Sequence, residues 1–199
     1  MSDTAQARET LAGRARVARF ALLASILTGL AVFALDAALL YDDPPLALYD
    51  VYGAVDGLDT LVTLGAAVAA AFWAAALFRV VKTAAARDDL VSPRTMGWLV
   101  FLFPLTLHLP WLYLRRAARL LGDPGCARIA TTTYAAEAAA LLLVVLLVGG
   151  SLTAPAGPIT NALALPMWLL VLIPFWLERV LIGRFTAAAL VARIEDVFA

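Results

Sequence analysis

The stretch that decides the fold is SPRTMGWLVFLFPLTLHLPWLYLRRAAR, residues 92–119. It is almost entirely apolar from Met96 to Leu114, a length that approaches the thickness of a bilayer core. Pro104 and Pro110 interrupt it. A proline inside a helix removes a backbone hydrogen bond and clashes with the preceding turn. The number of membrane crossings in the chain therefore depends on whether this segment crosses.

The composition of the chain is that of a membrane protein. Of the 199 residues, 63% are hydrophobic and 15% are charged, with a mean hydropathy of +0.89, whereas a soluble domain is closer to half apolar and a quarter charged. Fifteen basic residues balance fifteen acidic ones, so nothing indicates a nucleic-acid partner. One cysteine and one histidine exclude an intramolecular disulfide, a CxxC redox pair and a multi-histidine metal centre. We expect no cofactor and no metal.

Four other apolar stretches have the length of membrane-spanning helices. Each has about 20 residues, which at helical rise covers the hydrocarbon core. The second is rich in glycine and alanine, whose small side chains let helices pack closely in lipid. We predict spans at residues 20–40, 58–81, 132–148 and 161–182, preceded by a polar, helix-favouring segment at 1–19.

The segments between and after these spans are predicted to be loops and one surface helix. Residues 41–57 contain prolines and aspartates but no lysine or arginine, which favours a solvated loop. Residues 149–158 contain glycine, serine and proline without any charge, which is typical of a turn. Apolar side chains recur near helical spacing in residues 184–198, so we expect an amphipathic tail helix at the membrane surface.

The positions of the basic residues decide the predicted topology. Lysine and arginine accumulate on the cytoplasmic side of membrane proteins. If residues 96–114 do not cross, all fifteen basic residues lie on one side; if they cross, eight lie inside and seven outside. The first arrangement obeys the rule, so we predict four spans with both termini cytoplasmic.

The predicted fold class is therefore an all-α integral membrane protein with four transmembrane helices. Residues 96–114 form a proline-broken helical segment between the second and third spans, either re-entrant or lying in the interface plane. We expect one membrane domain over residues 1–199, in a bacterial plasma (inner) membrane. The bacterial origin is suggested by the heavy use of arginine and alanine.

Glu137 is the main candidate for a functional ionisable group. It lies about two turns into the third predicted span, where a charged side chain is costly. One alternative is that Glu137 makes a structural hydrogen bond between helices. The other is that it lines an inner-leaflet cleft together with His108 and Arg79, where Lys82 is another cation within reach. His108 is the only imidazole; without a nucleophile motif it does not indicate catalysis, and its ring alternatively bonds a carbonyl freed by Pro110.

Two further acidic residues in the predicted spans receive a simpler interpretation. Asp36 and Glu178 lie near the ends of their spans, and Glu178 precedes Arg179. We expect each carboxylate to reach the interface or to form a local ion pair.

The residues at the end of the deciding stretch are candidate contacts to lipid headgroups. An arginine near an anionic bilayer surface contributes on the order of 1 kcal/mol to membrane association, and tryptophan favours the same depth. The predicted headgroup contacts are Arg115, Arg116, Arg119, Trp98 and Trp111.

The region from residue 73 to residue 116 resembles a family of bacterial polytopic membrane proteins known only as a domain of unknown function. The likeness is carried by Trp73, Arg79, Ser92–Pro93, Gly97–Trp98, Pro104, Pro110, Trp111 and Arg115–Arg116. In that family, a Ser-Pro pair precedes an apolar segment with two prolines, between two pairs of spans. The resemblance implies this architecture and no activity.

The sequence contains no phosphate-binding glycine loop, GxSxG, HExxH or dinucleotide-binding pattern. We therefore expect a non-enzymatic integral membrane protein that associates with lipid or with other membrane proteins, including further copies of itself. The alternative is a small transporter or channel subunit with an inner-leaflet cleft near His108 and Glu137.

Overall fold

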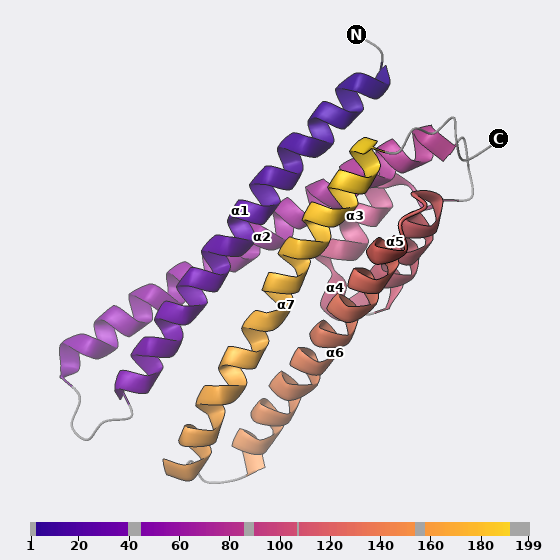
Figure 1. The fold of residues 1–199 in the computed structure, drawn as a ribbon. Helices are drawn as coiled ribbons and strands as arrows, with labels where there is room; N and C mark the ends of the chain where they lie inside the picture. Colours follow the sequence, from indigo (N-terminus) through magenta and orange to yellow (C-terminus); the bar gives the residue numbers. More distant parts are fainter. Residues whose placement is uncertain (1–2, 40–44, 86–89, 107, 154–157, 192–199) are drawn as a thin grey trace.

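The computed structural model describes residues 3–39, 45–85, 90–106, 108–153 and 158–191, and all regular structure in these ranges is helical (Figure 1). The predicted all-α class is therefore confirmed for the described residues. The helices are α1 (Asp3–Leu39), α2 (Leu46–Ala85), α3 (Pro93–Phe101), α4 (Phe103–Thr106), α5 (Leu109–Leu120), α6 (Pro124–Thr153) and α7 (Pro158–Val191).

Within the described ranges, three helical segments are long and apolar enough to cross a membrane. They are Ala5–Leu39 of α1, Leu46–Thr83 of α2 and Pro124–Leu146 of α6. A helix in lipid satisfies its backbone hydrogen bonds internally, so length and apolar composition are the two properties that a span requires.

The long helices lie side by side, and the short ones occupy one end of the bundle. α1 packs along α2, and α7 packs against both α1 and α6. α1 begins and α7 ends at the same end of the bundle (Figure 1). α3 follows the end of α2 and α5 leads back to the start of α6 at that same end, so α3, α4 and α5 form a hairpin along one side of the bundle, against α2 and α6 (Figure 1).

The hairpin forms because the sequence starts and stops its helices at defined positions. Ser92 caps α3, its Oγ accepting a hydrogen bond from the Thr95 N–H at 3.1 Å, and Pro93 occupies the first turn. Pro104 and Pro110 are the second residues of α4 and α5. The N–H groups of the first helical turn have no intrahelical acceptor, so a proline there costs no hydrogen bond. The predicted break of the helix at its prolines is confirmed.

Thr106 compensates the backbone at this break. Its Oγ1 donates to the carbonyl oxygen of Leu99 at 2.8 Å and lies 3.1 Å from that of Leu102. Carbonyls at the end of a helix lack intrahelical donors, and a side-chain hydroxyl can satisfy one of them. The Thr106 hydroxyl therefore supplies a donor to the Leu99 carbonyl where the helix breaks.

The structure corrects several predicted boundaries. Residues 46–57 are the first turns of α2 and not a loop, because Pro45 sits directly before the helix and its carbonyl accepts from the Leu48 N–H at 2.8 Å. Residues 149–153 continue α6 and 158–160 begin α7, because glycine and serine lower helix propensity without breaking a helix and helical backbone groups stay hydrogen-bonded.

The tail helix also differs from the prediction. Residues 184–191 continue α7 without interruption, so they do not form a separate amphipathic helix; the rest of the predicted tail, 192–198, lies outside the described residues. The polar segment at 1–19 is helical from Asp3 and continuous with the first predicted span, as expected.

The core lies where the hairpin meets the long helices. Small residues of α2 are fully buried there, which confirms the close packing predicted for its alanine-rich face: Ala66, Ala70 and Ala74 are 1%, 2% and 0% exposed. A Cβ on Gly97 of α3 would stand 3.1 Å from the carbonyl oxygen of Ala71, so glycine lets the hairpin lie directly on α2.

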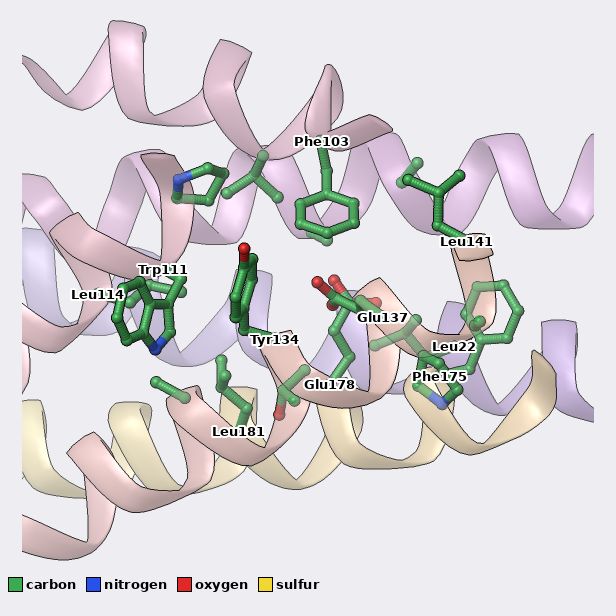
Figure 2. A pocket seen from close by; sticks show the side chains of 18 of the residues that line it. Leu22, Phe103, Trp111, Leu114, Tyr134, Glu137, Leu141, Phe175, Glu178 and Leu181 are labelled. Atoms are coloured by element: carbon green, nitrogen blue, oxygen red, sulfur yellow. The ribbon is translucent and has the colours of Figure 1, made fainter. Parts of the chain in front are cut away.

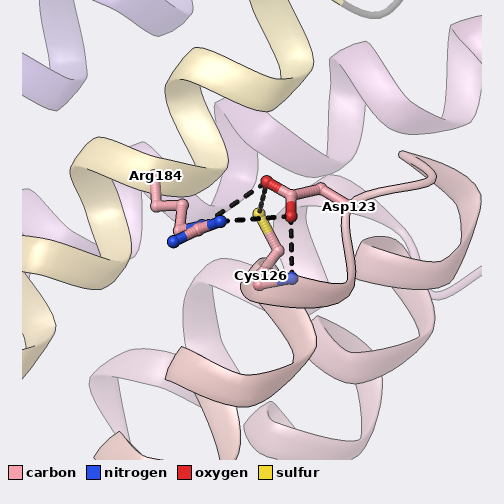
Figure 3. A network of polar contacts seen from close by, with 4 residues as sticks. Asp123, Cys126 and Arg184 are labelled. Carbon is pink, nitrogen blue, oxygen red and sulfur yellow. Dashed lines mark hydrogen bonds and ion pairs between the residues drawn. The ribbon is translucent and has the colours of Figure 1, made fainter.

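A polar network fixes α7 against the start of α6 (Figure 3). The carboxylate of Asp123 accepts from the Gly125 N–H at 2.7 Å, from the Cys126 thiol at 3.5 Å and from Arg184 of α7, whose Nε lies 3.5 Å away. Desolvation alone would raise the pKa of Asp123, but these hydrogen bonds and the Arg184 charge together lower it below its ordinary value. The network sets the register between the two helices that carry the site below.

Candidate functional site

A cavity of about 370 Å³ lies at the centre of the bundle. Every described helix contributes to its lining, from Leu22 of α1 to Leu181 of α7, and the hairpin closes one side through Phe103 and Trp111 (Figure 2). Most of the lining side chains are apolar, so the cavity has the character of a small-molecule site: mostly hydrophobic walls with a few polar groups.

Two glutamates from neighbouring helices point into this cavity. Glu137 comes from α6 and Glu178 from α7, and Figure 2 shows their carboxylates side by side, between Tyr134 and Leu141. No lysine or arginine of the described chain forms an ion pair with either carboxylate. A charged carboxylate in apolar surroundings is costly unless a cation or a proton accompanies it, so this pair needs one or the other.

Aromatic rings form the wall beside the glutamates. Trp111 of α5 stacks on Tyr134 of α6 with ring centroids 5.2 Å apart and an angle of 23° between the planes. The Trp111 Nε1 donates to Thr131 Oγ1 at 3.3 Å, and the Arg115 guanidinium lies 5.5 Å from the Trp111 ring centroid. These contacts hold the indole in place as part of the cavity wall.

The chemistry available in the cavity is that of carboxylates, hydroxyls and π faces. Tyr134, Thr133 and Thr63 supply hydroxyls, but the Thr133 Oγ1 is already bonded to the Ile129 carbonyl oxygen at 2.8 Å. Across the described residues, no group of three or more His, Cys, Asp or Glu side chains is placed to hold a metal ion. The arrangement therefore suits a monovalent organic cation, which carboxylates neutralise and aromatic faces attract.

The structure places the three predicted cleft residues apart. Glu137 lines the cavity, whereas His108 at the start of α5 and Arg79 on α2 are exposed and are not among its lining residues. The neighbour of Glu137 is Glu178, not a cation.

Glu178 is the site residue that the sequence interpretation missed. It was expected at the interface or in a local ion pair, but it faces the cavity, while the guanidinium of the adjacent Arg179 lies 5.4 Å from the Trp176 ring centroid. A partial signal was present: Glu137 lies 17 residues before the connection at 154–157 and Glu178 lies 21 residues after it, so antiparallel helices bring them to levels about one helical turn apart.

The candidate headgroup residues divide between the surface and the site. Trp98 is 55% exposed, and Arg115 and Arg119 are exposed on α5. Arg116 is half-buried, and Trp111 is half-buried as part of the cavity wall.

Comparison with family models, with curated proteins and with solved structures finds no match to this chain. The resemblance noted for residues 73–116 therefore stays a prediction, and the functional argument rests on the geometry of the site.

Proposed function

We propose that the chain is a bacterial inner-membrane protein in which α1, α2, α6 and α7 cross the bilayer and the α3–α5 hairpin is re-entrant from the cytoplasmic side. The distribution of charge supports this topology. The described basic residues lie in the first half of α1, the last turns of α2, the start of α3, the end of α5, the start of α6 and the last part of α7. Asp36, Asp50, Asp56 and Asp59 lie toward the opposite end. Basic residues favour the cytoplasmic side, which supports a cytoplasmic location for both termini.

Within this architecture, we propose that the protein binds a small organic cation with an apolar body, as a small transporter or solute-binding membrane protein. One observation carries the proposal: Glu137 and Glu178 converge in an apolar cavity, and no described cation pairs with them. This function corresponds to the transporter alternative raised from the sequence, with Glu178 in the place of His108.

The walls of the cavity explain why the ligand would be an organic cation and not a metal ion. Small metal ions need several oxygen ligands at short range, whereas most of this lining is hydrocarbon and aromatic. A positive group between Glu137 and Glu178 would be neutralised by the carboxylates, and its apolar substituents would contact Trp111, Phe103 and Phe175. The desolvated setting strengthens both interactions.

The test uses two ions of matched shape and opposite charge. Tetraphenylphosphonium should quench or shift the tryptophan fluorescence of the purified protein saturably, and tetraphenylborate should not. Glu137→Gln and Glu178→Gln should each weaken phosphonium binding by about tenfold or more, since each removes one charge-assisted contact. Asp50→Asn, an exposed change at the other end of α2, should leave binding unchanged. Equal binding of both ions, or no effect of either glutamate change, would remove the proposal.

A second function, association with lipid, is favoured by a separate observation. Arg115 and Arg119 are exposed on α5, and the indole of Trp98 is exposed on α3 of the same hairpin. These residues match the chemistry of a cytoplasmic headgroup layer. Both proposed functions are non-enzymatic, and neither requires a cofactor.

A further inference from the structure

A second hollow lies on the outer side of the bundle, between α2 and α3. Its volume is about 350 Å³, close to that of the central cavity, and its lining shares only Phe101 with the lining of that cavity. The residues that line it are Val68, Ala71, Phe72, Ala75, Arg94, Gly97, Trp98 and Phe101.

The shape of this groove follows from small residues at its base and aromatic residues at its sides. Gly97 lies on α2, where a Cβ would meet the Ala71 carbonyl oxygen at 3.1 Å and the Ala75 Cβ at 3.4 Å. Phe72 and Trp98 rise on either side and are 57% and 55% exposed. Trp98 is braced edge-on against Phe101, with ring centroids 5.9 Å apart.

Arg94 gives the groove a positive charge at the start of α3, and a second arginine, Arg14, lies against Phe72 of the lining. Arg94, in the first turn of α3, is exposed and is the one charged residue among those that line the groove. Arg14 of α1 lies over the ring of Phe72, 5.5 Å from its centroid, and its Nη1 donates to the Phe72 carbonyl oxygen at 3.1 Å. Among the described residues that line the groove, none is acidic.

We propose that this groove is a binding site for one anionic phospholipid of the cytoplasmic leaflet, with an acyl chain in the groove and the phosphate at Arg94. The groove is complementary to a phospholipid along its length. The guanidinium matches the anionic phosphate, and the apolar channel matches the hydrocarbon chain that follows it. Arginine binds phosphate through paired, charge-assisted hydrogen bonds, and Arg14 adds a second cation beside the same channel.

A second protein helix fits the groove less well than a lipid. Helix association in membranes needs a long contact along small residues, whereas this groove runs beside α3, which has only nine residues. The Arg94 guanidinium would make no favourable contact with the apolar surface of such a helix, but it can bind a phosphate. The lipid site is independent of the proposed cation cavity, since no residue except Phe101 lines both.

The site is tested by native mass spectrometry of the detergent-purified protein with added lipid. Phosphatidylglycerol should give a discrete one-lipid adduct that phosphatidylcholine of the same chains does not give at equal concentration. Arg94→Gln should reduce the fraction of this adduct by about tenfold, the loss of one charged hydrogen-bonding group. Arg16→Gln, an exposed change that faces away from Arg14 on α1, should leave it intact. Equal adducts for both lipids, or for wild type and Arg94→Gln, would overturn the proposal.

A fluorescence measurement tests whether an acyl chain lies in the groove, and it does not depend on the folding of Arg94→Gln. Phosphatidylglycerol with dibrominated chains should quench the Trp98 emission, obtained by subtracting the spectrum of Trp98→Phe, at a lower mole fraction than brominated phosphatidylcholine does. Filling the groove with Ala71→Leu should abolish this difference while the protein stays monodisperse. If a crosslinker placed at position 98 instead captures a second copy of the chain in bilayers, the groove is a protein interface and the lipid proposal is wrong.

Discussion

The indole Nε1 of Trp73 donates a hydrogen bond of 3.0 Å to the Oγ1 of Thr186, joining α2 to α7 inside the core. Both side chains are buried, and the Trp73 ring also meets Phe185 edge-on at 6.5 Å between centroids. Trp73 lines the central cavity as well, so this bond links the packing of the bundle to the shape of the site.

Removing one partner of this bond should destabilise the protein. Thr186→Val leaves the buried Trp73 N–H unpaired, at an expected cost of about 1–3 kcal/mol in the free energy of unfolding. Thr186→Ser keeps the hydroxyl and should cost less. The double variant Trp73→Phe/Thr186→Val should be more stable than the sum of the two single changes predicts, because no unpaired group is left. Thermal or denaturant unfolding in detergent measures the wild type, the three single variants and the double variant; strict additivity in the double variant would show that the bond has no energetic role.

The hydroxyl at the break of the hairpin should matter for both stability and the site. Thr106→Val removes the hydroxyl that donates to the carbonyl oxygen of Leu99, which should lower the free energy of unfolding by about 1–3 kcal/mol. Phe103 in α4 lines the cavity, so the same change should weaken phosphonium binding as the hairpin loosens. Thr106→Ser retains the donor and serves as the matched control. A Thr106→Val protein with wild-type stability would contradict this role.

The Asp123–Arg184 contact should make stability depend on pH at the acidic end. The folded-state pKa of Asp123 lies below its unfolded value of about 3.9, so its stabilising effect is present above pH ~4 and is lost as the pH falls through the folded pKa. Asp123→Asn should flatten the corresponding part of a melting-temperature profile. The effect should be modest, because Arg184 is 53% exposed. An unchanged profile in Asp123→Asn would show that other carboxylates control the acid transition.

A side chain at Gly125 should disturb the same Asp123–Arg184 contact. A Cβ at this position would overlap Arg184 Nη2, so Gly125→Ala must displace the guanidinium from Asp123. Because an arginine is flexible, we expect a loss of stability no larger than that of Arg184→Gln, and no further loss when the two changes are combined. Chemical denaturation of the three variants checks this. A combined loss equal to the sum would mean that Gly125→Ala acts elsewhere.

The proposed topology can be checked with introduced thiols. Cys126 is 0% exposed, so it should react with a maleimide only after denaturation, and Cys126→Ala gives a clean background. In that background, Asp50→Cys should be labelled by an impermeant maleimide in intact cells and Arg119→Cys only after permeabilisation. Both positions are exposed. Labelling of Arg119→Cys in intact cells would mean that residues 96–114 cross the membrane.

Much of the helical layout could be predicted from local sequence. Ser92, Pro93, Pro104 and Pro110 act on the backbone within one turn, so the starts and breaks of α3, α4 and α5 follow from them directly. The ends of the long helices were predicted less well. Residues 46–57 and 149–153 carry loop-forming residues and are helical nonetheless, because helix propensity is a weak signal that tertiary packing and unpaired backbone groups override.

The sequence by itself determined that this is an all-helical chain with apolar helices of membrane-spanning length, and that the segment around Pro104 and Pro110 is broken, since these properties depend on composition and on neighbouring residues. Only the tertiary structure decided that Glu137 meets Glu178 and not His108 or Arg79, and that Gly97 lies on Ala71 beside a groove with Arg94 at its end. Those contacts join residues far apart in the chain, and they depend on the register and rotation of packed helices, which no local pattern encodes.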